Sequence, residues 1–168
     1  MGNMTSGAED DDALANFLTF CSTRPLFFVK HAFTWGKGEL IDHQGPRGWQ
    51  IDILQGVQDG GLDPDTAFRV AVEFAAGRGH GAGASCMVAW LTLWRVYTCQ
   101  DSCVVMTDDG DAQCTKVWAH LSKWARLCLG SHKFALTATF AGPNEQEPAM
   151  VVFEANRDFP SDGDIGHT

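Results

Sequence analysis

A glycine-rich segment at residues 77–85, GRGHGAGAS, has the composition of a loop that binds phosphate groups. Glycines let the backbone turn sharply, so that several N–H groups can point at one anion. Ser85 stands where a helix would begin, and a hydroxyl there could bind Mg²⁺ while the helix N-terminus attracts negative charge. Gly83 and Ser85 fit the phosphate-loop pattern G-x-x-x-x-G-K-[ST].

Two positions depart from that pattern. Arg78 stands where the first glycine would be, and Ala84 stands where the lysine would be. The lysine would place a positive charge on the β- and γ-phosphates, which an alanine cannot do. Arg78 could supply part of the missing charge. The alternative interpretation is a glycine-rich turn between a strand and a helix that binds no ligand.

The hydrophobic pattern around this segment predicts alternating strands and helices. This order predicts an α/β fold of the P-loop NTPase type, with layers of helices on a mostly parallel central sheet. The predicted helices cover residues 46–58, 85–98 and 112–129, and the predicted strands cover residues 67–76, 102–107, 132–141 and 149–156.

Length and composition indicate one globular domain. The chain has 168 residues, 45% of them hydrophobic, with 6 Trp and 11 Phe. We expect an acidic disordered tail at residues 1–13, the domain at 14–160 and a second tail at 161–168. The net charge of −9 argues against non-specific nucleic-acid binding by this chain alone. No apolar run reaches the roughly 18 residues of a membrane span, and a basic, apolar leader is missing, so a cytoplasmic location is expected.

The remaining polar clusters favour structural roles. The six cysteines contain no CxxC pair, which predicts free thiols, most of them buried, and not a zinc site. Asp108, Asp109 and Asp111 could bind a metal ion, but a solvated turn that caps the next helix is the better interpretation. The six tryptophans fall on apolar faces and are expected mainly in the core.

Six blocks of the sequence, in the same order, resemble the ATPase region of the large terminase subunit of tailed phages. They cover most of the chain between Phe28 and Asn156. The blocks are FVKHAFTWG, GPRGWQIDIL, GRGHGAGASCMVAWLTLW, VVMTDDGDAQCTKVWAHLSKWARL, FALTATF and VVFEAN.

The resemblance implies a role for each matching residue. Gln50 would recognise adenine, because a side-chain amide can both donate to and accept from the adenine edge. Glu154 would be the catalytic acid that orients or deprotonates the attacking water, and with Ser85 it would hold Mg²⁺. The residues implied to bind the phosphates of ATP are Arg78, Gly79, His80, Gly81, Ala82, Gly83, Ala84 and Ser85.

The activity implied by the resemblance is ATP hydrolysis that drives viral DNA into a procapsid in the host-cell cytoplasm. The implied partners are viral DNA, a small terminase subunit, a portal protein and further copies of the chain. Phe153 stands where the family has a second acid, so we expect weak hydrolysis. The chain ends at Thr168 without the family's nuclease domain, which predicts a truncated ATPase domain. The alternatives are a non-catalytic relative that serves as an interaction or nucleotide-binding module, and a plain α/β domain whose loop binds another anion.

Overall fold

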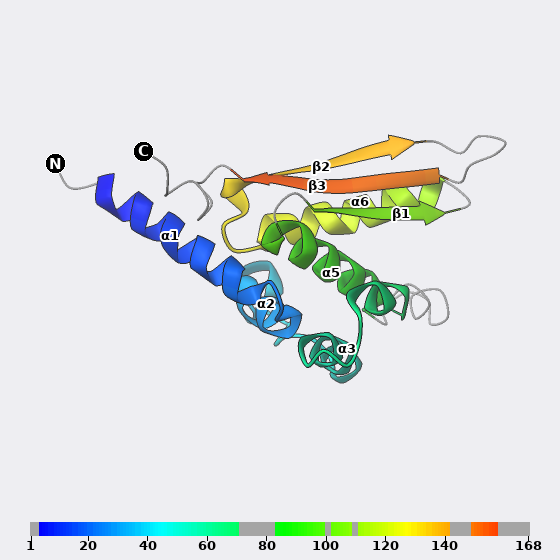
Figure 1. Ribbon diagram of the computed structural model, residues 1–168, viewed down its shortest axis with the longest axis horizontal. Helices are drawn as coiled ribbons and strands as arrows, with labels where there is room; N and C mark the ends of the chain where they lie inside the picture. Colours follow the sequence, from blue (N-terminus) through cyan, green and yellow to red (C-terminus); the bar gives the residue numbers. More distant parts are fainter. Residues whose placement is uncertain (1–3, 71–82, 100–101, 109–110, 142–148, 158–168) are drawn as a thin grey trace.

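The computed structural model describes residues 4–70, 83–99, 102–108, 111–141 and 149–157 (Figure 1). Its helices are α1 (Met4–Cys21), α2 (Pro25–Ala32), α3 (Gly48–Gln58), α5 (Ala84–Thr98) and α6 (Asp111–Leu127), and residues 64–70 are also helical. Its strands are β1 (Cys103–Asp108), β2 (Phe134–Ala141) and β3 (Ala149–Arg157). Short 3-10 helices lie at Gly38–Leu40 and Ser131–Lys133.

The described strands form one antiparallel sheet in the order β1-β3-β2. Val104 of β1 and Ala138 of β2 both lie opposite Phe153 of β3, which fixes the register. The prediction of a P-loop NTPase fold with a mostly parallel central sheet is therefore wrong, and the chain is mostly helical. Only residues 142–148 separate β2 from β3, whereas a parallel pair needs a crossover connection of about a dozen residues or more.

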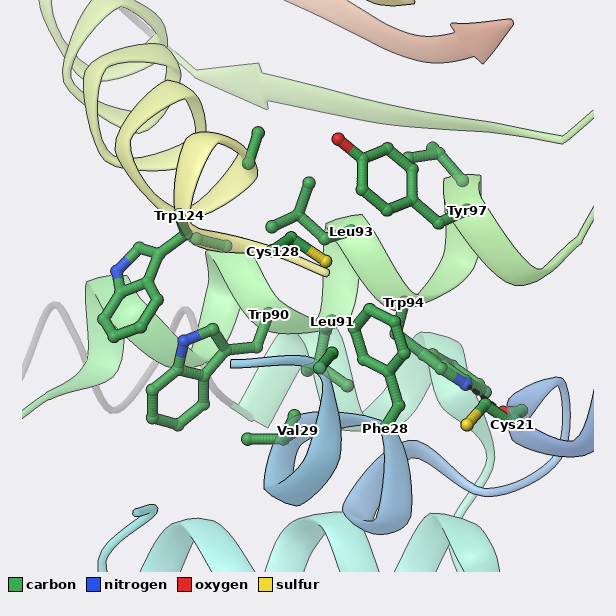
Figure 2. Packing of buried hydrophobic residues seen from close by; sticks show 14 of the residues in the cluster. Cys21, Phe28, Val29, Trp90, Leu91, Leu93, Trp94, Tyr97, Trp124 and Cys128 are labelled. Carbon is green, nitrogen blue, oxygen red and sulfur yellow. Dashed lines mark hydrogen bonds between the residues drawn. The ribbon is translucent and has the colours of Figure 1, made fainter. Parts of the chain in front are cut away.

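Helix α5 is the centre of the hydrophobic core. It lies between the sheet with α6 on one side and helices α1 and α2 on the other (Figure 1). Met87, Leu91 and Leu93 are fully buried, and the indole N–H of Trp94 donates to the carbonyl oxygen of Cys21 at 2.7 Å (Figure 2). The predicted helix at residues 85–98 is confirmed, and it is buried on nearly every side.

The N-terminal region differs from its prediction. Residues 4–13 belong to helix α1, where the sequence indicated a disordered tail. Leu14, Leu18 and Cys21 are buried and recur at helical spacing, so this stripe attaches α1 to the core. The acidic residues that indicated a tail lie in the same helix N-terminal to this stripe, and Glu9 and Asp10 are exposed.

The predicted strand at residues 67–76 is also corrected where the structure describes it. Residues 64–70 are helical and Ala67 is fully buried, while residues 71–76 lie outside the described part of the chain. A carboxylate oxygen of Asp63 accepts hydrogen bonds from the backbone N–H and the hydroxyl of Thr66, at 3.1 and 2.9 Å. Asp63 followed by Pro64 is a helix-start signal that outweighs the β propensity of the residues after it.

The other predicted elements are confirmed with small shifts of their ends. Helices α3 and α6 fall within or near the predicted ranges 46–58 and 112–129. Strands β1, β2 and β3 correspond to the predicted ranges 102–107, 132–141 and 149–156. The division of the chain into one domain with two tails, apart from residues 4–13, stays a prediction.

Folding stability should fall at alkaline pH because the core holds protonated acidic groups. Burial raises the pKa of the Cys21 thiol from about 9 to about 12, and burial also raises the pKa of Cys128 and of Tyr97. Above pH 9 the unfolded chain loses the Cys21 proton while the folded chain keeps it. The contribution of the Cys21 thiol to stability is therefore constant below about pH 9 and decreases up to about pH 12, by at most about 1.4 kcal/mol per pH unit.

Urea unfolding under reducing conditions at pH 8 and pH 10.5 measures this loss. Cys21→Ala should reduce the difference between the two pH values, although it lowers stability at both. Cys103→Ala, at an exposed position on β1, is the control and should keep the full difference. An equal pH dependence in Cys21→Ala and Cys103→Ala would contradict the assignment.

Candidate functional site

The start of α3 and the start of α5 meet through one buried amide, that of Gln50. Its Nε2 donates to the carbonyl oxygen of Gly83 at 2.7 Å, although the two residues are 33 positions apart in the sequence. Its Oε1 accepts the backbone N–H of Arg47, which precedes α3, at 2.7 Å. Gln50 is only 2% exposed, and a buried amide needs such partners. The side chain therefore ties the ends of two helices together.

Gly83 is required at this junction for two reasons. Its φ of +84° lies in the left-handed region, which glycine adopts without strain. A Cβ at this position would also lie 2.8 Å from Nε2 of Gln50, which is too close. The carbonyl of Gly83 also accepts the N–H of Met87 at 3.2 Å, so it begins the hydrogen-bond ladder of α5.

Among the described residues, one indole N–H and two cations act on the first turn of α5. Ser85 is exposed there, while Cys86 is partly buried. Burial raises the pKa of the Cys86 thiol, and the Trp124 indole N–H and the charges of Lys123 and Arg47 oppose this shift. Together with the partial positive charge of a helix N-terminus, these groups make the region suited to an anion.

The structure places only part of the predicted phosphate loop. Gly83 is the N-cap residue of α5, Ala84 is its first residue and Ser85 its second. The other predicted contacts lie outside the described residues: Arg78, Gly79, His80, Gly81 and Ala82.

Glu154, the predicted catalytic acid, lies at the opposite end of α5 from Gly83. It is exposed on β3, opposite Cys103 of β1. The neighbouring Ser102 donates to the carbonyl oxygen of Arg95 at 3.0 Å, in the last turn of α5. At 1.5 Å per residue, Arg95 is roughly 18 Å along the helix from Gly83. The described residues therefore do not bring Glu154 together with Gln50 and Ser85, and they contain no cluster of metal-binding side chains.

Phe153 is a core residue and not an open position for a second acid. It is fully buried, and its ring stacks on that of Trp118 of α6 with centroids 6.1 Å apart and planes at 11°. A carboxylate at this place would be buried between the sheet and α6.

Sequence reasoning missed Arg47 and the tryptophan cluster beside α5. Arg47 is part of the same GPRGWQ block as Gln50, and its position just before a helix was the available signal. Trp90 packs edge to face on Trp35 and Trp124, with ring centroids 5.7 and 5.2 Å apart. Figure 2 shows Trp90 and Trp124 side by side next to the first half of α5. The prediction that the tryptophans belong mainly to the core is confirmed for Trp90, Trp94 and Trp124.

Comparison of this chain with protein-family models, with curated proteins and with solved structures found no match. Among the helices that the structure describes, none is both long and apolar enough to cross a membrane.

We predict that Gly83→Ala lowers stability more than Gly60→Ala. Both glycines have a similar φ, +84° and +77°, so both substitutions cost about 1–2 kcal/mol of backbone strain. Only at Gly83 does the new Cβ meet a neighbour, Nε2 of Gln50. Displacing that amide should add about 1–3 kcal/mol, the cost of an unsatisfied buried group. Urea unfolding of both variants measures the difference, and equal losses would show that the Gln50 contact contributes nothing.

We also predict that Phe153→Asp destabilises the fold. Removing a buried phenylalanine costs about 3 kcal/mol or more, and the new charge would be buried without a partner. The control is Val105→Asp, on the other face of the same sheet, where the side chain is about half exposed and the change should be much milder. Thermal unfolding compares the two. A Phe153→Asp variant as stable as Val105→Asp would contradict the placement of Phe153 in the core.

Proposed function

We propose that this chain binds ATP with Mg²⁺ at the junction of α3 and α5 and hydrolyses it very slowly. The observation that carries the proposal is the hydrogen bond between Gln50 and Gly83. The resemblance to the terminase ATPase region assigns both residues to the nucleotide site, and the fold brings them into contact. The contact between two residues from separate sequence blocks supports the proposal.

The chemistry of the junction supports binding of the phosphate groups. The first backbone N–H groups of α5 have no partner within the helix. The exposed hydroxyl of Ser85 stands in the same turn. Gln50 uses both ends of its amide within the protein, so its main role is to hold Gly83 and not to read adenine. We therefore expect affinity to depend on the phosphate chain more than on the base.

Slow hydrolysis follows from the groups that the described residues do not provide at this end of α5. Ala84 carries no charge, and Glu154 lies at the far end of the helix. Loss of one preorganised contact typically costs on the order of 10²–10³ in rate, so two losses leave little turnover. DNA packaging and the cytoplasmic location stay predictions. So do the partners that the resemblance implies: viral DNA, the small terminase subunit, the portal protein and further copies of the chain.

Calorimetric titration with ATP and Mg²⁺ tests the proposal on the unaltered chain and on Ala84→Lys. A lysine at the first residue of α5 would add a charge-assisted contact worth roughly 1.5–3 kcal/mol, or about ten- to a hundredfold in affinity. Ala119→Lys is the matched control, because it adds the same charge at an exposed position on α6 and should leave affinity unchanged.

Two results would contradict the proposal. The first is a folded Ala84→Lys variant that binds ATP no better than the unaltered chain. The second is an equal gain from Ala119→Lys, which would indicate a general effect of net charge. Steady-state phosphate release on the order of 1 per second or faster would contradict the slow hydrolysis, and the unaltered chain should stay far below that rate.

A further inference from the structure

We propose that Arg47 supplies the positive charge on the phosphates that the missing lysine would provide. This inference rests on the proposed nucleotide site and names its main phosphate contact. Nη1 of Arg47 lies 3.8 Å from the place that a Cβ on Gly83 would occupy. Gly83 directly precedes Ala84, so the guanidinium lies within one residue of the position at which the phosphate-loop pattern has its lysine.

Gln50 fixes Arg47 relative to the start of α5. One end of its amide accepts the N–H of Arg47 and the other end donates to the carbonyl of Gly83, both at 2.7 Å. The backbone that carries the guanidinium is thus tied to the backbone that would carry the phosphates. A guanidinium offers several donors in a planar fork that matches two phosphate oxygens, which a lysine cannot do.

A second observation, in the first half of α5, points to a ligand that accepts hydrogen bonds. Trp90 is only 3% exposed, and its indole nitrogen has no hydrogen-bond partner within the part of the chain that the structure describes. It stands one turn after Cys86 on the same face of the helix, and helical side chains tilt toward the N-terminus. Figure 2 shows the ring of Trp90 extending from α5 toward Trp124. The indole N–H of Trp124 in turn lowers the pKa of the Cys86 thiol, against the effect of burial.

Among the described residues, the groups that act on the first turn of α5 are therefore mostly hydrogen-bond donors and cations. Burial raises the pKa of Cys86, and the nearby charges of Lys123 of α6 and Arg47 act against this rise, so both cations lie close to the first turn of α5. A buried donor without an acceptor is costly, and a phosphate oxygen is a strong acceptor. The chemistry fits a polyphosphate better than a neutral ligand.

Titration of the whole chain with ATP, ADP, AMP and adenosine, each with Mg²⁺, tests the inference. Tryptophan fluorescence and calorimetry give two independent readouts. The unaltered chain should bind ATP most tightly, with affinity falling as phosphates are removed. Arg47→Gln should weaken ATP binding about tenfold or more, the value of one charge-assisted contact, and should flatten the series from ATP to AMP. Arg47→Lys should restore part of the preference.

Arg95→Gln is the matched control, because Arg95 is an exposed cation at the far end of the same helix. It should leave the series unchanged. If the unaltered chain binds and Arg47→Gln keeps its full preference for ATP, the inference is overturned while the proposed function stands. An equal loss in Arg95→Gln also overturns it, because net charge would then be the cause. If the unaltered chain binds none of the four compounds, both the proposed function and the inference fail.

Discussion

The burial of α5 is the constraint on which the rest of the structure depends. Eleven of its residues between Met87 and Thr98 are buried, so neighbouring elements must cover the helix on every side. Helices α1 and α2 cover one side, and α6 with the sheet covers the other. Buried threonines use their hydroxyls within the helix, as Thr92 does on the carbonyl of Val88 at 2.8 Å, so they need no partner elsewhere. The polar side chains of α5 that could contact a ligand therefore lie near its two ends.

The two ends of α5 are held by different hydrogen bonds. At the C-terminal end, Ser102 hydrogen-bonds the carbonyls of Arg95 and Cys99, which leads the chain into β1. At the N-terminal end, Gln50 holds Gly83, and Arg47 stands beside it. Glu154 belongs to the first end and the proposed phosphate-binding groups to the second. Under the proposed function, this separation of the acid from the donors predicts phosphate binding without rapid hydrolysis.

Local signals predicted most elements, but not the way in which they pair. The apolar pattern located α3, α5, α6 and the three strands because each depends on its own residues. The direction of the strands depends on contacts between distant segments, and the expectation of a parallel sheet came from the order of the elements and was wrong. The helix after Asp63 was missed because β-forming residues were weighed above its cap. Gln50 and Gly83 were predicted as site residues from the sequence, whereas their contact and the position of Arg47 beside them could be recognised only in three dimensions.

The most direct test of the nucleotide site is to map where ATP changes the backbone of the labelled protein by NMR. Amide shifts should change at Arg47, Gly83, Ser85 and Cys86 on titration with ATP and Mg²⁺. Amides at the opposite end of α5, in Cys103 and Glu154, should keep their positions. Changes centred on Glu154, or an absence of changes at the start of α5 at saturating ATP, would contradict the account.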